Sequence, residues 1–158
     1  MALKNRQLLV VCSVGTGAVE QSDPRRLGVL PSPFSFFCYT NTMKVGTDII
    51  QISCIEKAIE RHQKRFLARY LNDEEIALVK KTATAAGFWA AKEAIAKALG
   101  CGIGRSLSFH DIILHKDAKG APSFSLSQQA QNTFNIQSHS LSISHDGGFA
   151  IAVVIIVL

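Results

Sequence analysis

The segment 85–99 carries three charged side chains whose types and spacing could do chemistry. Lys92, Glu93 and Lys97 are its only charged residues, and they stand among alanines and large apolar side chains. A helix that is apolar on nearly every side is usually buried, and buried charges must pair, bind a metal ion or change their pKa. Glu93 and Lys97 are four residues apart and share one helix face, so an ordinary helical ion pair is the simpler interpretation.

Two further residues outside this segment are candidates for a site. Asp48 ends a predicted strand in VGTDIIQI (45–52), where a carboxylate can face a cleft. With Gln51 three residues later, it also fits a capping box that opens the next helix. His145 lies in SISHDGG (142–148), where a histidine is either a binding residue or part of a turn. Neither residue identifies a function by itself.

The elements that must position these residues follow from hydrophobic periodicity and turn signals. Strands are predicted at 44–48, 107–115, 123–126, 140–144 and 149–158, and helices at 51–70, from Asn72 or Asp73 to 81, at 84–99, and from Ser127 to 134. This order predicts helices packed on one face of a mostly antiparallel sheet, which is an α+β fold.

Length and composition restrict the class of protein. The 158 residues are 47% hydrophobic and 18% charged, which indicates one globular domain and excludes a mainly disordered or collagen-like chain. The 17 Lys and Arg against 12 Asp and Glu give a net charge of +5, which suits an anionic partner without choosing one. The longest apolar run, 149–158, is too short for a membrane span.

Two regions of different character divide the chain. Residues 1–42 mix Gly, Ser, Thr and Pro without a sustained period, and we interpret them as an N-terminal extension. Residues 43–158 are regular and form the predicted domain. The four cysteines have neither zinc-ligand nor redox spacing, so we expect a reduced, cytoplasmic protein.

Order and spacing connect the candidate residues to a known family. The region 43–158 resembles holo-[acyl-carrier-protein] synthase, the small type of 4′-phosphopantetheinyl transferase. Five blocks carry the resemblance: GTDIIQI (46–52), QKRFLARYLNDEE (63–75), FWAAKEAIAKALGCGIGRSLSFHDI (88–112), KGAP (119–122) and SLSISHDGGFAIAVV (140–154). A single short motif would be weak evidence, whereas five blocks in order are specific.

The resemblance implies a reaction and a role for each candidate. Family members transfer the 4′-phosphopantetheine arm of coenzyme A to a serine of apo acyl carrier protein in fatty acid biosynthesis, and release adenosine 3′,5′-bisphosphate. Asp48 and Glu93 would bind Mg²⁺, Lys97 would act on a phosphate oxygen, and His145 would bind coenzyme A. A water positioned by Glu93 or Asp48 would take the serine proton.

The resemblance also implies two kinds of protein partner. Carrier proteins of this family are acidic, and Arg61, Lys64 and Arg65 beside Phe66 would dock them, although a solvated helix face is the ordinary interpretation of such charges. Family members are trimers with sites at subunit boundaries, and the apolar strand 149–158 agrees with a homotrimer.

Two departures from the family pattern affect these expectations. Phe88 stands where an arginine is common, and Cys54 stands at an often basic position of the first helix. The alternative function is a non-catalytic binding module for acidic partners, which leaves Glu93 unexplained. Nucleic acid is not an expected partner, because the chain lacks aromatic residues interleaved on strands and any motif that reads a groove.

Overall fold

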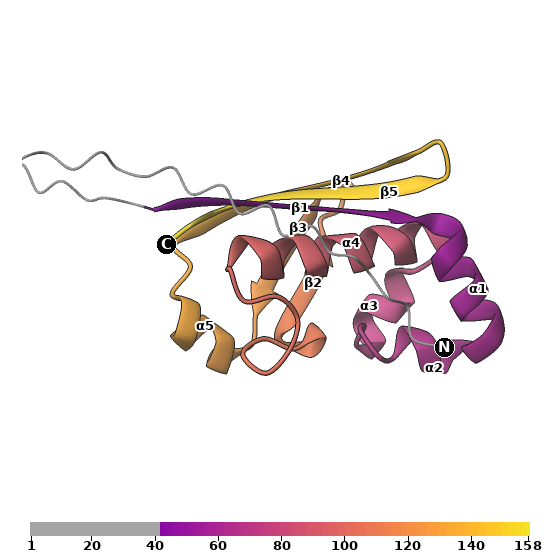
Figure 1. Cartoon of the computed structure of the whole chain (residues 1–158), viewed down its shortest axis with the longest axis horizontal. Coiled ribbons are helices and arrows are strands. Elements are labelled where there is room, and N and C mark those ends of the chain that lie inside the picture. Colours follow the sequence, from indigo (N-terminus) through magenta and orange to yellow (C-terminus); the bar gives the residue numbers. More distant parts are fainter. Residues whose placement is uncertain (1–41) are drawn as a thin grey trace, which may run out of the picture.

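The computed structural model describes residues 42–158 and contains the predicted α+β fold (Figure 1). Its principal sheet consists of β1 (Met43–Gln51), β5 (Phe149–Val157) and β4 (Ser138–Asp146), in that order and antiparallel. Figure 1 shows the helices on one side of this sheet. The expected arrangement of helices on one face of an antiparallel sheet is therefore confirmed.

The remaining elements lie beneath the principal sheet in Figure 1. They are α1 (Ile52–His62), α2 (Lys64–Leu67), α3 (Asp73–Leu78), α4 (Thr82–Ala98), the 3-10 helix η1 (Phe109–Asp111), the hairpin of β2 (Ile112–Lys116) and β3 (Pro122–Leu126), and α5 (Gln128–Phe134). Helix α4 runs along the sheet, between β1 and the lower elements, so it is covered on both sides.

Strand β5 shows why the sheet has two different faces. Its even-numbered residues from Ala150 to Ile156 are buried against α4, whereas its odd-numbered residues from Phe149 to Ile155 are exposed, although both sets are apolar. The buried set includes two alanines, which allow the helix to approach the sheet closely.

The closest approach is at Gly46 of β1. A Cβ atom built there would collide with the carbonyl oxygen of Ala94 and would lie 2.9 Å from the Cβ of Ala98. Since real Cβ atoms do not make such contacts with backbone, α4 packs directly on the β1 backbone at a place where only glycine fits. This contact sets the distance between α4 and Asp48, which lies two residues beyond Gly46 on the same face of β1.

Two sequence predictions about this region are wrong in detail. The predicted helix 51–70 is broken at Gln63, whose φ of 47° lies in the left-handed region, so α1 ends at His62 and α2 is a single turn. The predicted capping box of Asp48 is absent, because β1 continues past Asp48 and Gln51 is the N-cap, without a side-chain cap bond. Asp48 is therefore a mid-strand residue whose side chain is available to α4.

Other local predictions hold or change slightly. The Asn72 side chain accepts the N–H of Glu75, and the Glu75 side chain accepts the N–H of Asn72, which is a capping box at the start of α3. Ser127 caps α5 as expected. The first strand of the hairpin starts at Ile112 rather than 107, because Asp111 accepts hydrogen bonds from Ser108 and holds η1.

The predicted N-terminal extension, residues 1–42, lies outside the described residues except for Thr42. The division of the chain into that extension and a domain at 43–158 stays a prediction. Within residues 42–158, no helix has both the length and the apolar character that crossing a membrane requires.

Candidate active site

Asp48 and Lys97, which are 49 positions apart, form a buried ion pair. The Lys97 ammonium donates a hydrogen bond to Oδ1 of Asp48 at 2.7 Å, and the two side chains are 9% and 8% exposed. Asp48 comes from the face of β1 that meets α4, and Lys97 from the last turn of α4. The pair therefore joins the sheet to the helix, and Lys97 has a partner from a different element.

The surroundings of Asp48 make its charge depend on a nearby cation. Burial raises the pKa of the Asp48 carboxyl above its ordinary value, while the Lys97 hydrogen bond and charge and the Ile49 backbone N–H act in the opposite direction. A carboxylate in such a place is stabilised by any positive charge that reaches it. Asp48 thus has the character of a cation-binding group.

Glu93 is the second buried acid of this region. It is 4% exposed and lies one turn before Lys97 on α4, so the two side chains leave the helix on the same side. The helix that carries Glu93 packs on the strand that carries Asp48, with Gly46 at the contact. Three of the four predicted site residues therefore belong to one buried helix–strand contact.

His145 lies on the same face of the sheet but further out. In the register of the sheet, Asp48 and Ile143 are opposite Ala152, and His145 is opposite Ala150, two residue pairs closer to the β4–β5 turn. Residues opposite each other share a face, so His145 and Asp48 both lie on the α4 side, with Cα atoms on the order of 12 Å apart. His145 is exposed and suits the binding of a more distant part of an extended ligand.

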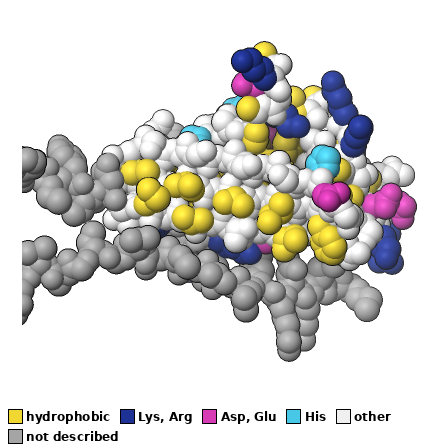
Figure 2. Space-filling view, turned by 90° about the horizontal axis from the view of Figure 1, so that it is seen from above, with side chains coloured by type: hydrophobic (Ala, Val, Ile, Leu, Met, Phe, Trp, Pro, Cys, Tyr) yellow, Lys and Arg dark blue, Asp and Glu magenta, His cyan; other side chains and the backbone are white. Residues whose placement is uncertain are grey.

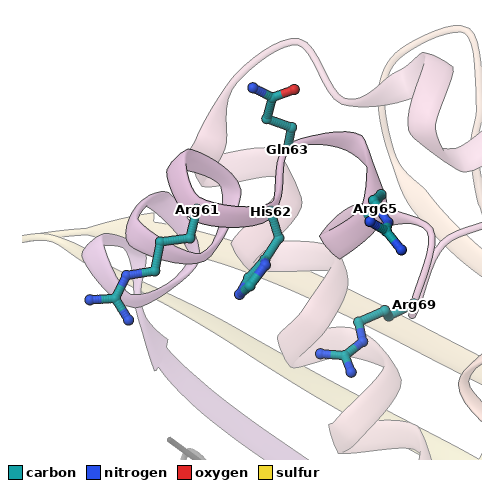
Figure 3. A pocket seen from close by; sticks show the side chains of 5 residues that line it. All are labelled: Arg61, His62, Gln63, Arg65 and Arg69. Carbon is teal, nitrogen blue, oxygen red and sulfur yellow. The ribbon is translucent and has the colours of Figure 1, made fainter.

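A basic hollow lies at the break between α1 and α2 (Figure 3). Its volume is about 660 Å³, and it is lined by Arg61, His62, Gln63, Arg65 and Arg69. The sequence pattern predicted Arg61 and Arg65 as docking residues. It did not indicate that His62 and Arg69 also lie at this surface. The reversal of the chain at Gln63 brings Arg69 to this surface, and no sequence signal marks a positive φ at a glutamine.

Comparison with known proteins identifies the family. Residues 44–154 match the family model of the 4′-phosphopantetheinyl transferase superfamily. The chain belongs to this superfamily. The resemblance seen in the sequence blocks is therefore confirmed.

Individual relatives agree with this assignment. Holo-[acyl-carrier-protein] synthase of Sulfurovum sp. (strain NBC37-1) is 66% identical over 111 residues, which cover 70% of this chain and 93% of that protein. The Campylobacter jejuni protein of the same name is 56% identical over 115 residues, or 73% of this chain and 100% of that protein. The Helicobacter pylori holo-[acyl-carrier-protein] synthase in complex with coenzyme A is 51% identical, with a TM-score of 0.69 over 71% of this chain and 98% of that one.

The structure corrects one predicted docking residue of this phosphopantetheinyl transferase. Phe66 is 6% exposed, because its ring stacks on Trp89 at 6.0 Å and contacts Tyr70 at 5.5 Å. It is a core residue and not an apolar anchor on the surface. Lys64 is exposed, as expected, but does not line the hollow.

The two departures from the family pattern have different surroundings. Phe88 is 1% exposed, and the ammonium of Lys116 lies 5.2 Å from the centre of its ring. A positive charge is thus present beside position 88, although the residue itself is apolar. Cys54 is half-buried on α1 and does not line the basic hollow.

The donor set at Asp48 and Glu93 fits magnesium in its chemistry. Both side chains offer carboxylate oxygens, which Mg²⁺ prefers, and it normally keeps waters and substrate oxygens as its other ligands. Within the described part of the chain, no group of three or more His, Cys, Asp or Glu side chains could hold a metal ion. A magnesium ion at these two acids would therefore depend on water and substrate to complete its coordination.

Replacement of Lys97 by methionine should destabilise the protein in a pH-dependent way. The variant leaves Asp48 buried without its cation, so the pKa of Asp48 rises further. The folded state then holds a proton that the unfolded chain releases above the ordinary aspartate pKa of about 3.9, so stability falls as pH rises. We expect a loss of about 1–3 kcal/mol at neutral pH, measured by urea denaturation, and a smaller loss near pH 4.

The double variant Asp48→Asn/Lys97→Met tests the cause. It removes both charges and should recover most of the lost stability, whereas Lys119→Met, at an exposed lysine of the β2–β3 turn, should change little. A loss in Lys97→Met that is equal at pH 4 and pH 8 would contradict the ion pair.

Proposed function

We propose that the chain is a holo-[acyl-carrier-protein] synthase. It transfers the 4′-phosphopantetheine arm of coenzyme A to a serine of apo acyl carrier protein and releases adenosine 3′,5′-bisphosphate, in the cytoplasm and in the service of fatty acid biosynthesis. Membership of the superfamily and the names of the relatives support the reaction. The observation that carries the proposal is the buried Asp48–Lys97 pair, one turn from Glu93, on the helix–strand contact that faces the same side as His145.

The chemical problem is electrostatic, because a hydroxyl must attack a diphosphate that is already negative. A magnesium ion held by Asp48 and Glu93 would neutralise part of the charge on the diphosphate. Lys97 adds a fixed positive charge on the same side of α4 and donates to a phosphate oxygen as negative charge develops there. His145, further out on the same face, binds the coenzyme A portion. Glu93 or Asp48 positions the water that receives the serine proton.

Replacement of Asp48 or Glu93 should greatly reduce the rate of transfer while the protein stays folded. We expect Asp48→Ala and Glu93→Gln to lower kcat/KM by at least about 100-fold at saturating magnesium, because each removes an oxygen ligand and a charge from the reacting centre. The measurement is the added mass on purified apo carrier protein after incubation with coenzyme A, with and without chelator. Glu74→Gln, at an exposed acid of α3, is the matched control.

Wild-type rates in both acid variants would refute the metal-centred mechanism. A wild-type protein that binds the carrier but adds no mass to it would instead favour the non-catalytic binding module.

The carrier protein docks, we propose, at the basic hollow of α1 and α2. The predicted docking residues Arg61 and Arg65 line it, Arg69 extends the positive surface, and His62 lies beside them (Figure 3). Opposite potentials steer an acidic partner to such a surface and fix its orientation. Because Phe66 is buried, charge rather than an aromatic anchor determines this contact.

Reversal of two of these charges should weaken docking selectively. In Arg61→Glu/Arg65→Glu we expect the KM for carrier protein to rise about 10-fold or more, while kcat and the KM for coenzyme A change little. Steady-state kinetics at low and at raised ionic strength measure this, since salt screens the wild-type attraction. Lys119→Glu, which reverses one charge in the same way on the β2–β3 turn, should keep the wild-type KM. An unaltered KM for carrier protein in the double variant would mean that these arginines form only a solvated helix face and do not dock the carrier.

The exposed face of the principal sheet supports self-association as a homotrimer. Figure 2 views this face, on which apolar side chains follow the strands. Its large apolar residues are 37–61% exposed: Met43, Val45, Ile49, Phe149, Ile151, Val153 and Ile155. A continuous apolar surface of this kind is usually covered by a partner. Identical chains related by rotation cover it with the same elements.

A charge in the middle of this face should separate the subunits. We expect Val153→Lys to reduce the sedimentation mass to that of one chain, because a buried ammonium without a partner opposes association. Ser123→Lys, at an exposed residue of β3, is the control and should keep the wild-type mass. A Val153→Lys protein that is folded and still trimeric would place the interface elsewhere.

A further inference from the structure

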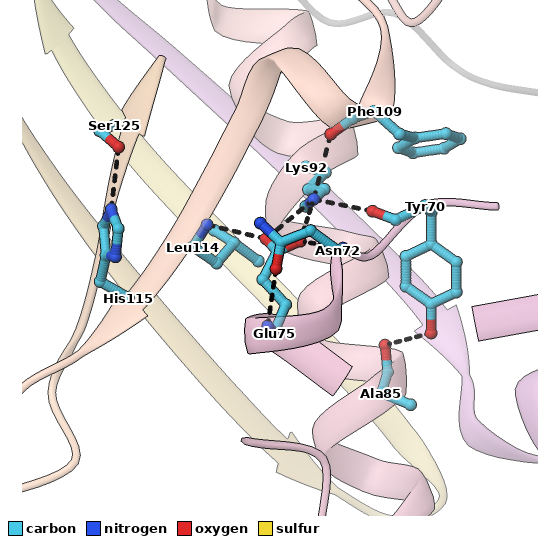
Figure 4. Close-up of polar contacts among 9 residues, drawn as sticks. All are labelled: Tyr70, Asn72, Glu75, Ala85, Lys92, Phe109, Leu114, His115 and Ser125. Atoms are coloured by element: carbon cyan, nitrogen blue, oxygen red, sulfur yellow. Dashed lines mark hydrogen bonds and ion pairs between the residues drawn. The ribbon is translucent and has the colours of Figure 1, made fainter. Parts of the chain in front are cut away.

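Lys92 is completely buried, and its ammonium group is held by three neighbours (Figure 4). It donates to the carbonyl oxygen of Tyr70 at 2.7 Å, to the carboxylate of Glu75 at 2.9 Å and to the carbonyl oxygen of Phe109 at 3.0 Å. Lys92 is 0% exposed and Glu75 is 1% exposed. All three hydrogens of the ammonium thus have acceptors, so one position of the group satisfies all of them.

Glu75 is satisfied in the same way from other elements. One oxygen accepts the backbone N–H of Leu114 in β2 at 2.8 Å, and the other accepts the N–H of Asn72 at the start of α3 at 2.8 Å. The ion pair therefore connects α4 to the end of the α2 segment, to α3, to η1 and to β2. We call Lys92, Glu75 and these hydrogen bonds the Lys92 clamp.

Stability alone does not account for the choice of a lysine and a glutamate here. A buried ion pair is often no more stabilising than apolar side chains of similar volume, because both charges lose their hydration. What the pair adds is geometry, since several directional bonds around two fixed charges allow one arrangement of the surrounding segments.

The clamp lies on the side of α4 opposite to the Asp48–Lys97 pair. Its partners belong to the lower elements, whereas Asp48 belongs to the principal sheet above α4 (Figure 1). Lys92 directly precedes Glu93, and consecutive residues leave a helix about 100° apart. The rotation and height of α4 that satisfy Lys92 therefore also fix the direction of Glu93 and Lys97.

We infer that Lys92, together with Glu75, is a positioning residue for the transfer reaction, which orients α4 so that Glu93 and Lys97 face Asp48. This inference rests on the proposed function. Lys92 itself does not reach the substrate, because its three hydrogen bonds are made within the protein interior. The contribution of the clamp is to kcat, through the geometry of the reacting centre, in addition to any effect on stability.

The chain contains its own reporter for the clamp. Trp89, the only tryptophan, lies one turn before Lys92 on α4, and its ring contacts those of Tyr70 at 5.0 Å and Phe109 at 4.9 Å. The carbonyl groups of these same two residues accept the Lys92 ammonium. A shift of α4 relative to this layer should therefore change the emission of Trp89.

The test compares Lys92→Met with Leu71→Ala in the purified full chain. Methionine keeps the length of the side chain and removes the charge and its bonds, whereas Leu71→Ala opens a cavity at a residue that is 1% exposed in the same layer. At a temperature where both variants are folded, we expect kcat to fall about 100-fold in Lys92→Met, with shifted Trp89 emission. In Leu71→Ala, kcat per folded molecule should stay within about twofold of wild type despite its lower melting temperature.

Two further variants keep the inference testable if Lys92→Met does not fold. Glu75→Gln retains the shape of the side chain but replaces one acceptor oxygen by an NH₂ group, and we expect a fall in kcat of about 10-fold. The exchange Lys92→Glu/Glu75→Lys restores opposite charges but not the bonds to the Tyr70 and Phe109 carbonyl groups, so it should not restore kcat.

The outcomes separate this inference from the proposed function. Absence of transfer by the wild-type protein would overturn the proposed function, and the role of Lys92 with it. Transfer by the wild type with undiminished kcat in folded Lys92→Met, or an equal fall in Leu71→Ala, would overturn the positioning role alone.

Discussion

The structure depends on the burial of a helix that carries charge. Helix α4 is enclosed between the principal sheet and the lower elements, yet it holds Lys92, Glu93 and Lys97, all of them buried. An unpaired buried charge costs far more than a single hydrogen bond returns, so the neighbouring layers must supply partners. Asp48 on one side and Glu75 on the other meet this requirement for the two lysines. The positions of β1 and α3 relative to α4 are thereby set by charge pairing as well as by apolar packing.

Close packing makes this charge pairing geometrically strict. The surface of α4 that meets the sheet consists largely of alanine, and Gly46 lets the backbone of β1 touch the helix. Because the side chains packed between α4 and β1 are mostly short, they cannot adjust to a displacement of the helix. A lysine that reaches from α4 to β1 therefore meets a carboxylate at a fixed height. The same constraint that packs the core brings Asp48 and Lys97 together, one helical turn from Glu93.

The sequence predicted those features that depend on local chemistry. The apolar pattern of 84–99 predicted a buried helix, Asn72 was a predicted cap of a short helix, and the apolar run from Phe149 predicted a strand. Non-local outcomes were not predictable in this way. The partner of Lys92 lies 17 positions away, and the break at Gln63 has no glycine to mark it. Phe66 was predicted as a surface anchor because it follows the basic residues in the sequence, whereas its ring packs on Trp89, 23 positions away. Asp48 was found as a candidate, but its capping role was wrong, since β1 runs past it.

The two faces of the principal sheet explain how one small domain can have both a buried reacting centre and an apolar surface. On β5 both sets of alternating residues are apolar, a pattern that suits a strand covered on both sides. Within one chain, α4 covers the even-numbered face only, and His145 lies exposed near the β4–β5 turn. The odd-numbered face has no element of residues 42–158 above it. Since β1 carries Asp48 on one face and Val45 and Ile49 on the other, a partner that covers the outer face would also hold in place the strand from which Asp48 reaches Lys97.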